Sequence, residues 1–251
     1  GRTTGAPIAL SIPNRDHAAW KGKSVSAYTV VRPGHADLAA CVKYGFDDIR
    51  PALERSSARE TACRVAVGAI ARAFLAKFGI TASSYVAALG TVPESQTPLR
   101  EALDFAANSP SRAPSQAQED AYTNAIHLAR SKGETLGGLI VTVVDGLPIG
   151  LGSYVTPDRR LDARLGAAVL SVNAIKGVSF ADAFANTALP GSACHDPILL
   201  QDGHITRPTD RDGGLEGGIT TGQPLIVRAA MKPIPTTLAP QQSVDLATHA
   251  P

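Results

Sequence analysis

The sequence predicts an α+β protein, and three observations carry this prediction. Short apolar runs bounded by Gly, Pro and Asn are interspersed with longer alanine-rich segments of helical period. These segments do not follow the strand–helix–strand rhythm of a doubly wound sheet, and no repeat of fixed period occurs. With 44% hydrophobic and 18% charged residues, the 251-residue chain can build a real core. We therefore expect a single domain over residues 1–251.

The first half of the chain is predicted to hold two strands and one long helix. Residues 7–12, PIALSI, predict a buried strand that ends at Pro13-Asn14. The helix is predicted from Ser57, because Ser57-Ala58-Arg59-Glu60 has the spacing of a capping box and apolar residues then recur at helical intervals. Residues 84–92 predict a strand. Residues 91–118, rich in Pro, Ser and Gln, predict a surface loop or a short helical excursion.

The second half is predicted to contribute two helices and two strands. Residues 119–131 predict a helix, and the apolar run at 137–148 predicts a strand. Residues 159–175 predict a second helix, closed by Lys176-Gly177. Residues 224–233 predict another strand, and the polar residues at the end of the chain are expected to fray.

Charge and cysteine content argue against several classes of function. A formal net charge of +2 without a basic run argues against nucleic-acid binding, and no apolar stretch is as long as a membrane span. The three cysteines are few and odd in number, which is typical of a reducing compartment, so we expect a cytoplasmic protein. Cys63 falls inside the first predicted helix and is expected to be a small core residue. Cys194, His195 and His204 lack a recognised ligand spacing, so no metal site is expected.

The start of the long helix is a candidate anion site. A helix N-terminus presents free N–H donors and a positive partial charge. Arg55 and Arg59 add two guanidinium groups, whose geometry matches phosphate or carboxylate oxygens. The alternative is a solvated arginine pair on an ordinary helix cap.

Three other stretches carry groups with useful chemistry. His35 follows a Pro-Gly turn in RPGHAD and could act as a general acid, although an exposed bystander is the alternative. The run DRDGGLEGGITTGQP at 210–224 allows close backbone approach to a ligand, or is simply a flexible loop; Ile219 stands where a P-loop needs lysine. Lys232 is held between prolines in MKPIPTT, or marks a plain strand exit. Together these groups predict a site for a planar ligand beside an anionic one.

Five stretches of the chain resemble one enzyme family. They are RPGHAD, KYGFDDIRPALERSSARETA, LPIGLG, SVNAIKGV and GGLEGGITTGQPLIVRAAMKPIPT, in this order from about residue 32 to 236. In these motifs the chain is similar to chorismate synthase. The resemblance implies helices sandwiched between antiparallel sheets and a homotetramer. It also implies a shikimate-pathway lyase of aromatic amino-acid biosynthesis, which converts 5-enolpyruvylshikimate 3-phosphate to chorismate by anti-1,4 elimination of phosphate. The family requires reduced FMN, with NADPH as the candidate flavin reductant.

The resemblance further implies roles for individual residues. His35 matches the histidine taken to protonate the reduced flavin, and Arg59 would bind the anionic substrate. The residues expected to bind FMN are Arg55, Ser56, Ser57, Asn173, Ala174, Gly217, Lys232, Pro233, Ile234, Pro235 and Thr236.

The chain also departs from the family's pattern. The family begins several tens of residues earlier, with an ESHG motif, and continues after residue 236 into an arginine–aspartate motif and a final helix. We therefore expect this chain to be incomplete at both ends. TDRDGG, residues 209–214, replaces a pattern that normally reads Asn and a small residue around the arginine. These changes leave a second hypothesis open, a catalytically degenerate relative that retains flavin or anion binding.

Overall fold

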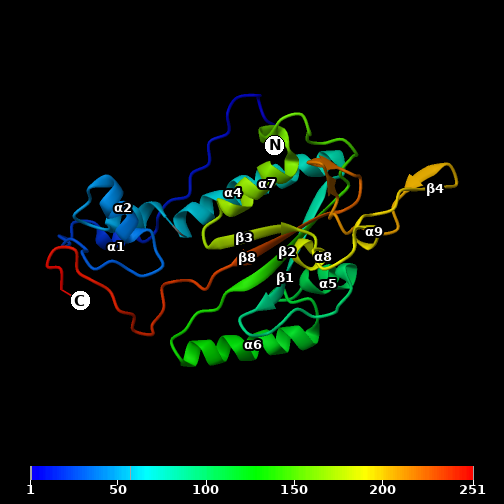
Figure 1. Ribbon diagram of the computed structural model, residues 1–251. Helices are drawn as coiled ribbons and strands as arrows, with labels where there is room; N and C mark the ends of the chain where they lie inside the picture. The colour runs from blue at the N-terminus through cyan, green and yellow to red at the C-terminus, as the bar shows by residue number, and fades with distance from the viewer. Residues whose placement is uncertain (1, 57, 251) are drawn as a thin grey trace. The chain divides into compact units, whose positions relative to one another are not determined.

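The computed structural model describes residues 2–56 and 58–250, and the chain folds into two compact units (Figure 1). The first unit comprises Gly1–Ala73 with Gln241–Pro251, and the second comprises Phe74–Pro240. The single domain expected from the sequence therefore stays a prediction.

The described residues of the first unit form helices joined by long loops. Its helices are α1 (His17–Trp20), α2 (Asp37–Tyr44), α3 (Arg50–Arg55) and α4 (Ala58–Leu75), the last of which runs across the division between the units. Val31, Cys41 and Ile49 form its buried core, and Phe46 and Leu246 pack against them.

Two sequence predictions in this unit are wrong. Residues 7–12 form no strand and are exposed, because an apolar run becomes a strand only where another strand pairs with it. The end of the chain is not frayed: Asp245 bridges to Val30, and Leu246 donates its N–H to the carbonyl oxygen of Thr29.

The second unit is built on a four-stranded antiparallel sheet, so the predicted α+β class is confirmed. The strand order is β1-β2-β8-β3, comprising β1 (Thr81–Leu89), β2 (Gly138–Asp145), β8 (Leu225–Met231) and β3 (Ile175–Phe180). Two small hairpins add β4 (Leu199–Gln201) with β5 (His204–Thr206) and β6 (Leu215–Glu216) with β7 (Ile219–Thr220). Figure 1 shows the β4 hairpin projecting away from the sheet.

Helices cover the two faces of this sheet. The helices and 3-10 turns of the unit are η1 (Ala76–Phe78), α5 (Leu99–Ala106), α6 (Gln116–Ser131), η2 (Pro157–Arg159), α7 (Leu161–Leu170), α8 (Ala183–Asn186) and α9 (Gly191–Cys194). On one face, Leu161, Leu165 and Val169 of α7 pack against the buried Leu225 and Val227 of β8. On the other face, Leu103 of α5 packs with Ala87, Val141 and Val143.

The strands predicted at 84–92, 137–148 and 224–233 and the helix at 119–131 are confirmed, with shifted ends. Within 91–118 a helical excursion is present as α5, with loops at 91–98 and 107–115 on either side, and Ala102 and Ala106 are fully buried. The helix predicted at 159–175 is wrong beyond Leu170, because Lys176-Gly177 lies inside β3 instead of closing a helix.

Cys63 is exposed on α4, which corrects its expected core position. None of the helices in the described part of the chain has the length and apolar character that a membrane crossing requires.

Candidate functional site

An ion pair between Arg32 and Asp37 holds the turn that carries His35. The buried Asp37 carboxylate accepts from Arg32 Nε at 2.8 Å, from Nη2 at 3.0 Å and from the Arg32 backbone N–H at 3.1 Å. Burial by itself would raise the pKa of Asp37, but the hydrogen bonds and charge of Arg32 outweigh it and hold that pKa below its usual value. His35 is half-buried and donates its backbone N–H to the Arg32 carbonyl oxygen. These contacts fix the backbone of the turn on which His35 lies, and the role of its imidazole stays a prediction.

The arginines around the start of α4 are each paired with a carboxylate. Arg59 Nη1 lies 2.8 Å from Glu54 Oε2, and Arg55 pairs with Glu60, so ion pairs bridge the break between α3 and α4. The side chains of Arg55 and Arg59 remain 77% and 46% exposed. An anion can approach both guanidinium groups, but it must compete with two protein carboxylates.

Ser56 of this motif lies at the same break. Ser56 ends α3 and donates its hydroxyl proton to the carbonyl oxygen of Ala52 at 2.6 Å. Ser57, the predicted N-cap and flavin ligand, lies outside the described residues. The structure therefore commits the Ser56 hydroxyl to its own helix.

Arg59 lines a cavity of about 250 Å³ in the first unit. Arg50 lies in the same wall, with its guanidinium 5.6 Å from the ring centre of Tyr28. Arg50 also bonds Asp48, and its hydrogen bonds lower the pKa of that carboxyl to about 2. Sequence reasoning missed Arg50 and Tyr28. The available signal was Arg50 itself, nine positions before Arg59 in the same family-like stretch.

In the second unit the structure brings two predicted flavin motifs together. Asn173 and Ala174 form the turn from α7 into β3, and the Lys232 backbone N–H donates to the Ala174 carbonyl oxygen at 2.9 Å. Ala174 adopts φ +69°, a left-handed conformation that is uncommon for a residue with a Cβ and frequent at functional sites.

The segment that follows Lys232 runs beside the loop before β2. Thr135 donates its hydroxyl proton to the Ile234 carbonyl oxygen, and Thr236 lines a cavity of about 400 Å³ with the 133–136 segment. Pro233 approaches Gly137 so closely that a Cβ on Gly137 would lie 2.9 Å from its ring. Contacts with this loop thus position the backbone of the predicted flavin segment.

Gly217 lies apart from this group. It occupies the β6–β7 turn at φ +59°, next to Gly218, whose carbonyl oxygen accepts from Leu161 at the start of α7. Asn173 follows the other end of α7, and a ten-residue helix is about 15 Å long. A Cβ on Gly217 would meet no atom within 4 Å, so this turn borders open space. Only a ligand as extended as the helix could contact both ends.

Two of the predicted flavin ligands offer groups that an anionic ligand could contact. Lys232 carries a cationic side chain, and the open turn at Gly217 leaves room for a ligand against the backbone. Within the described ranges, no group of three or more His, Cys, Asp and Glu side chains could hold a metal ion.

Comparisons with known proteins identify the family of the chain. A family model described as chorismate synthase matches residues 1–251. Chorismate synthase of Chlorobaculum parvum is 47% identical over 268 aligned residues, which cover 99% of this chain and 65% of the relative. Chorismate synthase 1 of Bacillus thuringiensis is 45% identical, with 100% of this chain and 69% of the relative covered.

A solved crystal structure of chorismate synthase superimposes with a TM-score of 0.75 at 41% identity and covers 80% of this chain and 63% of that one. The chain thus spans about two thirds of the length of these relatives. The chain belongs to the chorismate synthase family.

Proposed function

We propose that this protein acts as a chorismate synthase, eliminating phosphate from 5-enolpyruvylshikimate 3-phosphate in an anti-1,4 sense to give chorismate, with reduced FMN as cofactor. The observation that supports this most is the family match along all 251 residues, including every motif that carries a proposed site residue. The same proposal includes a cytoplasmic homotetramer and NADPH as the candidate flavin reductant.

On the substrate side, Arg59 would bind the anionic substrate at the mouth of its cavity. To do so its guanidinium exchanges the Glu54 carboxylate for a substrate oxygen, or contacts both, since a guanidinium has five donors. His35 would hold the proton that passes to the flavin. The Arg32–Asp37 ion pair keeps the turn beneath His35 in place while it does so.

On the cofactor side, the proposed FMN ligands of the second unit are Asn173, Ala174, Gly217 and the segment 232–236. Bound FMN would supply the reduced flavin ring that the reaction requires, although the overall conversion is redox-neutral. Lys232 would neutralise part of the cofactor's charge, and the main chain around Ala174 would orient it. In the first unit, the family resemblance implies Arg55, Ser56 and Ser57 as further FMN ligands.

The test is flavin binding with and without substrate, measured on the 251-residue chain and on the full protein that its gene encodes. FMN fluorescence is expected to titrate at lower concentration when 5-enolpyruvylshikimate 3-phosphate is present, because each ligand shields the other from water. Chorismate formation is then followed by its absorbance under anaerobic conditions with chemically reduced FMN. An FMN affinity that does not change when substrate is added would refute the proposal.

A degenerate flavin- or anion-binding relative remains the second candidate. It is favoured by the carboxylates that already occupy Arg55 and Arg59, and by Asp210 in place of the expected asparagine. Substrate-dependent FMN binding by the full encoded protein without chorismate formation would identify this case.

A further inference from the structure

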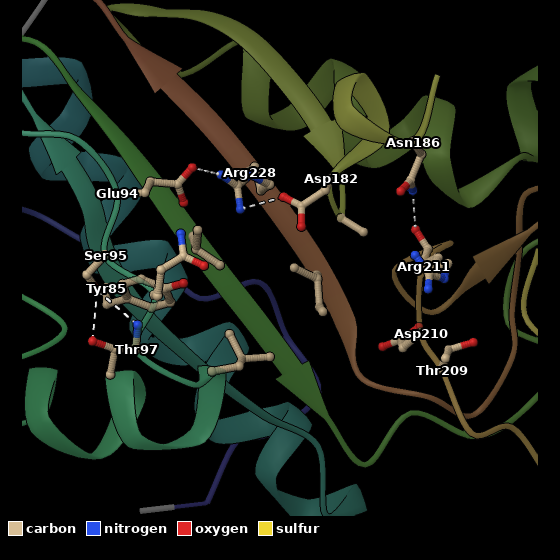
Figure 2. Close-up of a pocket in the computed structure, with 15 residues that line it drawn as sticks. Tyr85, Glu94, Ser95, Thr97, Asp182, Asn186, Thr209, Asp210, Arg211 and Arg228 are labelled. Carbon is tan, nitrogen blue, oxygen red and sulfur yellow. Dashed lines mark hydrogen bonds and ion pairs between the residues drawn. The ribbon is translucent and has the colours of Figure 1, made fainter. Parts of the chain in front are cut away.

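A trio of charged side chains, Glu94, Asp182 and Arg228, lies on the sheet face that carries α5. Arg228 belongs to β8 and is only 16% exposed. Its Nη2 pairs with Glu94, from the loop before α5, and its Nη1 lies 2.9 Å from Asp182 Oδ1, just before α8 (Figure 2). Three segments distant in sequence therefore meet at one guanidinium.

The trio forms the common wall of two cavities of the second unit. The first cavity, about 540 Å³, is lined by the trio, by polar residues of the 95–97 segment and by the 209–211 loop. The second, about 380 Å³, is lined by the trio and by apolar surface from Leu139, Ala230 and Phe184. Phe184 is 81% exposed, so this apolar surface is open to solvent.

The charges of the trio do not balance. Two carboxylates face one guanidinium, which leaves one net negative charge where the two cavities meet. Asp210 and Arg211 also line the first cavity, but they carry opposite charges and offset one another. Asp182 is 65% exposed and Glu94 is 38% exposed, so both carboxylates can still accept a hydrogen bond from a ligand.

We propose that this junction binds a small organic ammonium compound. The ammonium group would donate hydrogen bonds to Glu94 and Asp182, and an apolar body would lie on Leu139, Ala230 and Phe184 in the second cavity. A bare metal ion does not suit the site, since no group of metal-binding side chains occurs among the described residues. The site shares no residue with the flavin and substrate sites proposed above.

The test uses three probes with the same phenyl body and different charge: 2-phenylethylamine, 2-phenylethanol and phenylacetate. Binding to the whole chain is measured at pH 7.5 by saturation-transfer NMR with concentration titration. The amine is expected to bind at least about fivefold more tightly than the alcohol, and phenylacetate more weakly than either. Absence of saturable amine binding below about 10 mM, or equal affinity for amine and alcohol, would overturn the proposal.

Two variants locate the site. Glu94→Gln and Asp182→Asn each remove one carboxylate of the trio and should raise the dissociation constant of the amine about fivefold without changing that of the alcohol. Asp202→Asn removes the same charge from the exposed turn of the β4–β5 hairpin and should change neither. Circular dichroism tests whether each variant is folded. If Glu94→Gln unfolds, the test rests on Asp182→Asn, because Asp182 is the more exposed of the two carboxylates. The amine would bind elsewhere if a folded trio variant kept its full amine affinity. The same conclusion would follow if Asp202→Asn lost as much amine affinity as the trio variants.

Discussion

Replacing Asp210 with Asn is expected to stabilise the protein at neutral pH. One carboxylate oxygen of Asp210 accepts the Gly214 backbone N–H at 2.8 Å, whereas Oδ2 is buried without a hydrogen-bond partner among the described residues. Burial is the main cause that raises the pKa of Asp210 from 3.8 to about 6, and the neighbouring Asp196 and Asp212 add to it while Arg207 opposes it. The charged form is therefore unfavourable in the folded state.

The sign of the pH dependence follows from linkage. Because the folded protein holds the Asp210 proton more tightly than the unfolded chain, the free energy of unfolding falls as pH rises from about 4 to about 6 and then levels off. A shift of roughly 2 pKa units corresponds to at most about 3 kcal/mol. Since Asp210 is only half-buried, solvent screening reduces the expected effect to roughly 1 kcal/mol.

Asn keeps an oxygen acceptor for the Gly214 N–H and removes the charge, so Asp210→Asn should recover this roughly 1 kcal/mol at pH 8 and much less at pH 4. Urea denaturation at both pH values measures the difference, and the melting temperature at pH 8 should rise by roughly 2–4 °C. Asp202→Asn, on an exposed hairpin turn, is the matched control and should show no such pH-dependent gain. An equal gain at pH 4 and pH 8, or none at pH 8, would refute the reasoning.

Three further predictions concern ligand binding and stability. Arg59→Ala should weaken substrate binding, measured by calorimetry, at least about tenfold. The unfolding free energy should change by no more than about 0.5 kcal/mol, because the side chain is half-exposed. Comparable losses of substrate binding and of stability would indicate a capping role alone. Tyr122→Phe should lower the free energy of unfolding, measured by urea denaturation, by about 1 kcal/mol. The fully buried phenol donates a hydrogen bond to a main-chain carbonyl oxygen of β1, and Phe lacks that donor. An unchanged free energy of unfolding would contradict that hydrogen bond. Gly217→Ala should weaken FMN binding more than folding. Its Cβ meets open space, so only the left-handed φ destabilises the fold, by about 1 kcal/mol, whereas Gly152→Ala puts a Cβ 2.2 Å from a carbonyl oxygen and should destabilise the fold by more. Similar stability losses in the two variants would argue against this contrast.

Local pattern predicted three strands of the central sheet. The strands at 84–92, 137–148 and 224–233 were found because short apolar runs bounded by turn residues are typical of buried strands. The same reasoning placed a strand at 7–12 and a helix through 175, and both were wrong. An apolar run does not show whether a partner strand exists, and Gly177 in β3 marks a register shift rather than a helix end.

The sequence by itself determined the family and the identity of the proposed site residues, because the five motifs lie in fixed order along the chain. Tertiary structure decided how those residues are engaged: the carboxylate partners of Arg55 and Arg59, and the contact of Ala174 with Lys232. It also assembled the Glu94–Asp182–Arg228 trio, whose members lie up to 134 positions apart. Periodicity and turn chemistry describe neighbours within a few residues, whereas such contacts depend on how the whole chain packs.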